Sequence, residues 1–174
     1  EIAQCLVGSE MCIRDSIITL MAIAMLFPIT AFAQAYVQTW DLVDSGKHLD
    51  YDGNSTYMSY INTGAATWNA YKSGVIRKDS AFVVEDVYVS DVNASNGWAG
   101  MTYSSGKIEL NTYYMSGYSN SKKQNVATHE LGHALGLDHS TSTDVMDAAI
   151  TGHTSTQALS QNDKDSYDAA YNNY

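Results

Sequence analysis

The chain has 174 residues, of which 45% are hydrophobic and 16% charged, and its formal net charge is −10 at pH 7. Nucleic acid and anionic membrane surfaces are poor partners for such an acidic chain, because like charges repel. The length is enough for one hydrophobic core, and we expect a single folded domain without a propeptide or an added binding domain.

The N-terminal region has the pattern of an export signal. Residues 17–29 form an apolar run with the length of a signal-peptide core, and Ala-Phe-Ala at residues 31–33 is a small-x-small cleavage site. The run is too short for a good membrane span. We therefore predict a signal peptide over residues 17–33, a secreted, extracellular protein, and no stable membrane span after the signal is removed.

The remaining residues fall into a leader and a folded domain. Residues 1–16 resemble translated sequencing-adapter read-through, and we interpret them as a non-native leader. Residues 34–174 are expected to form the domain. They contain no cysteine, so burial of the core has to stabilise the fold without disulfides, helped by any bound metal.

The first predicted element of the domain is an amphipathic helix. In residues 56–71, apolar side chains recur at spacings of three and four, as on a helix that packs under a sheet. Two nearby segments, residues 50–54 and 91–97, collect oxygen ligands near a glycine. Either could bind calcium, but Asn, Asp, Ser and Gly are also ordinary turn residues, and turns are our main interpretation.

Strands are predicted in the middle of the domain. Residues 82–92 are rich in β-branched and aromatic side chains, and residues 99–103 are a second, shorter candidate. Residues 106–111 alternate as a half-buried strand does.

The most informative segment is HELGHALGLDH at residues 129–139. On a helix, His129 and His133 point from one face, so both imidazoles can bind one metal ion. Gly136 can adopt the left-handed conformation that ends a helix, and the turn would return His139 to the same ion. Three protein ligands leave one position open, which is typical of a catalytic zinc.

Glu130 and Met146 extend this hypothesis. A glutamate beside zinc-binding histidines can take a proton from water. Met146 lies seven residues after His139, where a tight turn could give the metal a non-ligating apolar floor. Taken alone, Met146 is more typical of a core residue, and two histidines one turn apart are often only a polar helix face. The full five-residue pattern is much rarer than a bare HExxH.

These residues resemble the metzincin zinc endopeptidases, whose signature is HExxHxxGxxH followed by a methionine turn. The resemblance is closest to the matrixin-like branch, which includes small secreted bacterial members, and it covers roughly residues 47–171. It implies an α+β, zincin-like catalytic domain over residues 34–174. The expected fold has a twisted, mostly parallel sheet with an antiparallel edge strand, and three main helices.

The resemblance also implies roles for segments around the metal. Ile108, Glu109 and Leu110 would lie in the edge strand that pairs with an extended substrate. Ala148, Ala149 and Ile150 would line the pocket for the side chain after the scissile bond. A terminal helix would begin after the N-cap Ser160 and run to about Tyr171.

Four further residues are interpreted through the same resemblance. Asp163 would brace the methionine turn. Asn162 stands where matrixins have the first aspartate of an acidic pair, so their salt bridge to a processed N-terminus is not expected. The second, structural zinc of animal matrixins is not expected either, because His48 and His153 stand alone as solvated or locally hydrogen-bonded histidines.

We interpret the chain as a secreted, monomeric zinc endopeptidase with one catalytic zinc, bound by His129, His133 and His139. Zinc would polarise the scissile carbonyl and Glu130 would be the general base. Its partners would be protein or peptide substrates, not nucleic acid. One alternative is a catalytically weak, zinc-containing module that binds peptides or cell wall, although Glu130 argues against it. Another is a metal-sequestering protein, which an open three-ligand site fits poorly.

Overall fold

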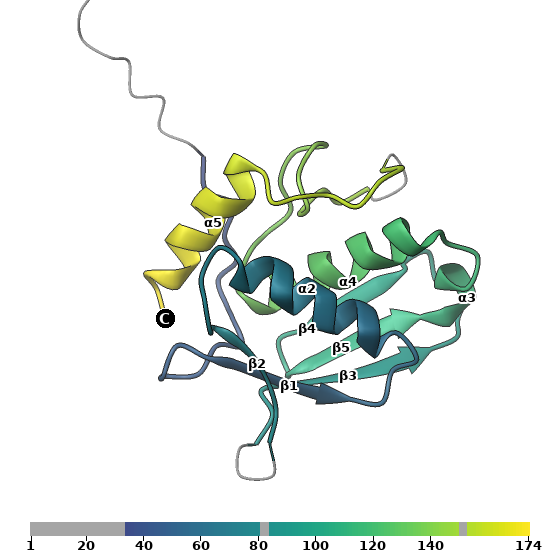
Figure 1. Ribbon diagram of the computed structural model, residues 1–174, viewed down its shortest axis with the longest axis horizontal. Coiled ribbons are helices and arrows are strands. Elements are labelled where there is room, and N and C mark those ends of the chain that lie inside the picture. The colour runs from purple at the N-terminus through teal and green to yellow at the C-terminus, as the bar shows by residue number, and fades with distance from the viewer. Residues whose placement is uncertain (1–33, 81–83, 150–152) are drawn as a thin grey trace, which may run out of the picture. The chain divides into compact units, whose positions relative to one another are not determined.

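The computed structural model describes residues 34–80, 84–149 and 153–174, all of which belong to a compact unit of Ala33–Tyr174 (Figure 1). The predicted leader and signal peptide lie outside the described residues. No helix within the described ranges is long and apolar enough to cross a membrane. The elements, in chain order, are β1 Leu49–Gly53, α2 Met58–Asn69, β2 Ile76–Lys78, β3 Val87–Val92, β4 Gly100–Tyr103, β5 Lys107–Asn111, α3 Thr112–Met115, α4 Asn120–Ala134 and α5 Gln161–Tyr171.

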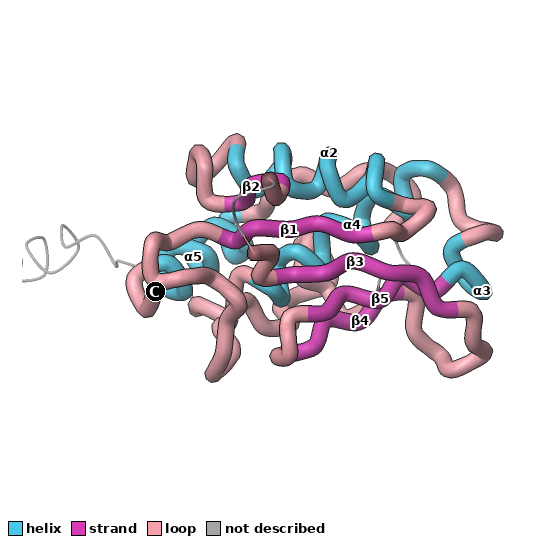
Figure 2. Tube along the Cα trace, turned by 90° about the horizontal axis from the view of Figure 1, so that it is seen from below, coloured by secondary structure: helices cyan, strands magenta, loops and turns pink. Residues whose placement is uncertain are grey.

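A five-stranded sheet forms one layer, with the strand order β2-β1-β3-β5-β4. The first four strands of this order run parallel, and β4 pairs with β5 in the antiparallel direction. The predicted α+β fold, with a mostly parallel sheet and an antiparallel edge strand, is therefore confirmed. Seen from below, the strands lie in front of α4 (Figure 2).

Helices α2 and α4 cover the same side of the sheet and pack against each other (Figure 1). Their close approach depends on Gly64, because a Cβ atom there would lie 3.1 Å from both Leu131 and the backbone of Thr128. Trp68 reaches across from α2 and donates its indole N–H to the carbonyl oxygen of Thr128 at 2.9 Å. The helix carrying the first two histidines is thus held from one side by α2.

Helix α5 starts at the predicted N-cap. Ser160 accepts from the backbone N–H of Asp163, and the Asp163 carboxylate accepts from that of Ser160, which forms a capping box. Tyr167 of α5 packs edge-on against Trp68 of α2, with 5.5 Å between ring centroids. The three long helices therefore share one core, as expected.

The structure corrects the predicted position of the edge strand. Ile108, Glu109 and Leu110 belong to β5, which lies between β3 and β4 and pairs with both. Ile108 and Leu110 are fully buried. Because both backbone edges of β5 are occupied, a substrate cannot pair with it. The edge strand next to β5 is β4, and β2 forms the opposite edge of the sheet.

Strands β1 and β2 were not predicted. Residues 50–54 had been interpreted as a turn, but most of them lie in β1. Asp50 is tolerated in this buried strand because Arg77 of β2 donates two hydrogen bonds to its carboxylate, at 2.9 and 2.6 Å.

Candidate metal centre

Helix α4 places His129 and His133 on one face, and its first turn is capped by Ser119, whose side chain accepts from the N–H of Lys122 at 3.2 Å. The rings of the two histidines lie 4.6 Å apart between centroids. His129 and Glu130 are both only 4% exposed, so the helix carries them into the interior beside the sheet.

The chain turns after α4 as Gly136 predicts. Gly136 has φ +84°, and the N–H of Leu137 bonds the carbonyl oxygen of Gly132 at 3.0 Å, which closes the end of the helix. A Cβ atom at position 136 would also lie 3.0 Å from the side chain of Asp41. The reversed chain then brings His139 to within 3.2 Å of His133, measured between their Nε2 atoms.

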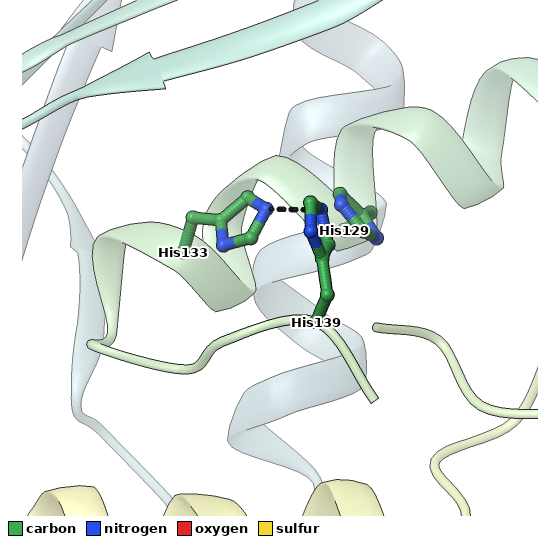
Figure 3. Close-up of side chains that lie close together, drawn as sticks. All are labelled: His129, His133 and His139. Atoms are coloured by element: carbon green, nitrogen blue, oxygen red, sulfur yellow. Dashed lines mark hydrogen bonds between the residues drawn. The ribbon is translucent and has the colours of Figure 1, made fainter. Parts of the chain in front are cut away.

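The three imidazoles converge on one point (Figure 3). One ligand nitrogen from each lies within 4.8 Å of the other two. Two nitrogens bound to one tetrahedral zinc at about 2.0–2.1 Å are about 3.4 Å apart, and the separation between His133 and His139 is close to this value. The residues therefore fit a zinc ion.

Hydrogen bonds orient the first two ligands. Nδ1 of His129 lies 2.8 Å from the carbonyl oxygen of Val145, and Nδ1 of His133 lies 2.9 Å from that of Leu137. A carbonyl only accepts, so Nδ1 of His129 carries the proton and its Nε2 is left with the lone pair. Nδ1 of His133 faces a donor as well as the carbonyl, because Nε2 of Gln38 lies 2.8 Å from it. Gln38, which the sequence analysis did not single out, donates to the same Leu137 oxygen at 2.9 Å.

Burial sets the protonation of these groups. It lowers the pKa of His129 to about 3, with a smaller contribution from the neighbouring His133, and it also lowers the pKa of His133. Both rings are therefore neutral near pH 7, as metal ligation requires. Burial raises the pKa of Glu130 to about 7, while the hydrogen bond from Thr102 lowers it. A bound cation would favour the carboxylate form of Glu130.

The methionine turn lies against α4. Met146 is 1% exposed, and a Cβ atom added to Gly132 would lie 2.3 Å from its sulfur, so Met146 packs directly on the metal-binding helix. Asp163 accepts hydrogen bonds from the N–H groups of Val145 and Met146, at 3.0 and 3.2 Å. The bracing role that the family resemblance implied for Asp163 is confirmed.

The edge strand β4 borders the metal centre. The Thr102 hydroxyl donates to Oε2 of Glu130 at 2.7 Å, and Gly100 lies against the same carboxylate. Residues 99–103 had been predicted as a strand, but nothing in their pattern indicated contact with Glu130. That contact arises only when β4 and α4 come together.

A cleft of about 410 Å³ runs between β4 and α4. His129, Glu130, His133 and His139 line it, together with Ala148 and Ala149, whose role as the wall of a substrate pocket stays a prediction. Ile150, the third predicted pocket residue, lies outside the described residues. Other lining side chains include Trp98, Met101, Tyr118 and Lys122.

Calcium is not supported at either predicted segment. The Asp91 carboxylate already accepts from the Ser55 hydroxyl at 2.5 Å and from the N–H and hydroxyl of Thr56, at the start of α2. The other segment is largely strand β1. His153 is locally bonded as expected, with its Nε2 3.1 Å from the Asp147 carboxylate.

The match to a family model agrees with this geometry. The family model described as Matrixin matches residues 30–172. No curated protein matches the chain. A solved structure described as "GM1 bound form of the ECX AB5 holotoxin" is similar, with a TM-score of 0.43 and 18% identity over 62% of this chain. The present chain spans 59% of the length of that chain.

Proposed function

The chain belongs to the matrixin family of zinc metallopeptidases, and we propose that it is an endopeptidase that uses Glu130 as its general base. One observation carries the proposal. Three imidazoles converge at the spacing of a zinc site, and the carboxylate that follows the first of them lines the same cleft. A zinc held by three protein ligands keeps an open position, as catalytic sites do.

Zinc and Glu130 would have different roles in hydrolysis. When bound, zinc would supply Lewis acidity, lowering the pKa of a water molecule and polarising a carbonyl. Glu130 would take the proton of the attacking water and later give it to the nitrogen of the leaving amine. Burial of Glu130 supports this role, because it raises the pKa of the carboxyl group and so makes the carboxylate a stronger proton acceptor.

The substrate would lie along β4. Its outer edge pairs with no other strand of the described sheet, and it borders the cleft. An extended peptide could add to this edge through backbone hydrogen bonds. Ala148 and Ala149 would then wall the pocket for the side chain that follows the cut.

The cellular setting is part of the proposal. The apolar run and small-x-small site of residues 17–33 support export, with removal of that segment before the domain acts outside the cell. The domain would comprise residues 34–174 and act as a monomer.

A binding module without turnover is less well supported. Such a module would not need a buried carboxyl group beside the histidines. Removing the Glu130 carboxyl group from water costs free energy whether it is ionised or protonated, and it adds no contact to zinc. Glu130 is nevertheless buried and hydrogen-bonded.

The decisive experiment compares wild type with Glu130→Gln on casein and on quenched peptides, with and without chelator. The amide keeps the shape of the side chain but cannot accept the proton, so we expect a rate loss of at least about 10²- to 10⁴-fold. Zinc content and thermal stability should stay at the wild-type level. Wild-type turnover in Glu130→Gln, or turnover that chelator does not affect, would refute the mechanism.

A further inference from the structure

The inner face of β4 is shaped around the Glu130 carboxylate. Gly100 and Thr102 are two residues apart, so they face the same side of the strand. A Cβ atom at Gly100 would lie 2.4 Å from Oε1 of Glu130 and 2.7 Å from its Cγ. Thr102 places its hydroxyl oxygen 2.7 Å from Oε2. Two neighbouring positions of the edge strand thus contact the two oxygens of one carboxylate.

These contacts treat the two oxygens differently. Oε2 accepts from the Thr102 hydroxyl, whereas Oε1 has no hydrogen-bond partner among the described residues and lies where a side chain at position 100 would be. Glu130 lines the cleft. One oxygen is therefore tethered and the other is free to meet a water molecule.

The hydroxyl of Thr102 also has a second acceptor, the backbone oxygen of Glu130 at 3.0 Å. A hydroxyl donates one proton, and a bond to a carboxylate is stronger than one to a neutral carbonyl. The short distance to Oε2 fits that preference. If Oε1 takes a proton, Oε2 remains an acceptor, so the tether survives the change of charge.

We propose that Thr102 is a positioning residue that holds Oε2 of Glu130 and thereby directs Oε1 toward the attacking water. Gly100 supports the arrangement by leaving room for Oε1. The inference rests on the proposed function, since it concerns the orientation of the base in that reaction. In this arrangement β4 would both pair with the substrate and orient the carboxylate of Glu130.

The test compares Thr102→Val and Thr102→Ser in the zinc-loaded protein. Valine keeps the branched shape and the strand preference of threonine but has no hydroxyl, whereas serine keeps the hydroxyl and loses the methyl group. For Thr102→Val we expect kcat to fall about 10- to 100-fold, as for loss of one hydrogen bond to a charged group. KM and the zinc Kd, measured by chelator competition, should change less than about twofold. Thr102→Ser should keep at least about half of wild-type kcat.

Thr112→Val is the matched control. Its hydroxyl donates to the carbonyl oxygen of Val92 at 3.1 Å, away from the cleft, so its removal should leave kcat unchanged. The inference is overturned if Thr102→Val keeps kcat within twofold of wild type, or if Thr102→Ser falls as far as Thr102→Val. It is also overturned if kcat drops only in proportion to zinc content. Absence of chelator-sensitive turnover in wild type would instead refute the proposed function, and this inference with it.

Discussion

Replacing Asp163 with alanine would test how strongly α5 supports the metal centre. Its carboxylate accepts from three backbone N–H groups, those of Val145, Met146 and Ser160, at 3.0, 3.2 and 2.8 Å. Val145 and Met146 are 5% and 1% exposed, so water cannot easily replace the lost acceptor there. Ser160 is partly exposed, and its N–H can be hydrated.

The expected loss of stability follows from these contacts. Each buried hydrogen bond to a charged group contributes about 1.5–3 kcal/mol, and loss of a helix cap costs about 1 kcal/mol. Two buried bonds and one cap together give about 4–7 kcal/mol, a large share of the total stability of an ordinary domain. Asp163→Asn keeps one acceptor oxygen, and we expect about half of that loss.

Urea unfolding of the zinc-free protein, followed by tryptophan fluorescence, would measure the difference. Asp165→Ala is the control, because its carboxylate lies on the same helix and accepts from the Gln161 side chain at an exposed position. It should change stability by less than about 0.5 kcal/mol. A loss for Asp163→Ala no greater than for Asp165→Ala would refute the argument.

Three other predictions concern the ligands, acid stability and substrate preference. His139→Ala should abolish tight binding of one zinc per chain, and full zinc occupancy of the variant in metal analysis would rule out the three-histidine site. Burial raises the pKa of Asp144, but hydrogen bonds with Ser160, Thr141 and Asn162 outweigh this effect and lower the pKa to about 2. The carboxylate should therefore contribute about 2 kcal/mol to the free energy of unfolding above pH 4, and this contribution should vanish toward pH 2. Urea unfolding of zinc-free Asp144→Asn should show this difference from wild type at pH 7 and not near pH 2, whereas an equal difference at both pH values would contradict it. Peptides varied at the residue after the cut should be cleaved best with medium or large apolar side chains there, since each buried methylene contributes about 0.8 kcal/mol, and a preference for charged residues would exclude Ala148 and Ala149 as the pocket wall.

The sequence predicts the parts of the site that depend on local spacing. His129 and His133 are four residues apart on one helix, and the turn at Gly136 is a short-range property of glycine. The cap at Ser160 likewise needs only a few neighbouring residues. All of these are found where they were expected.

The order of strands is not a local property. Residues 99–103 and 106–111 have similar patterns of alternation, and only the pairing of β5 with β3 decides which strand lies at the edge. β1 was missed because its aspartates resemble turn residues until Arg77 is placed beside Asp50. Contacts such as that of Thr102 with Glu130, across 28 positions of the chain, leave no local pattern to recognise.

The backbone of Val145 joins the metal centre to the C-terminal helix. Its carbonyl oxygen lies against Nδ1 of His129, and the N–H of Met146, which belongs to the same planar peptide group as that carbonyl, donates to Asp163 at the start of α5. A peptide group transmits position rigidly, so α5 restrains His129, a proposed zinc ligand that lies more than thirty positions earlier in the chain. The segment from His129 to His139 contains every proposed ligand, yet it would not bind zinc equally tightly outside this fold. If the segment were grafted onto another helix, it would keep the histidine nitrogens but lose the Val145 carbonyl that sets the tautomer of His129. Its zinc affinity should therefore be about 10- to 100-fold weaker.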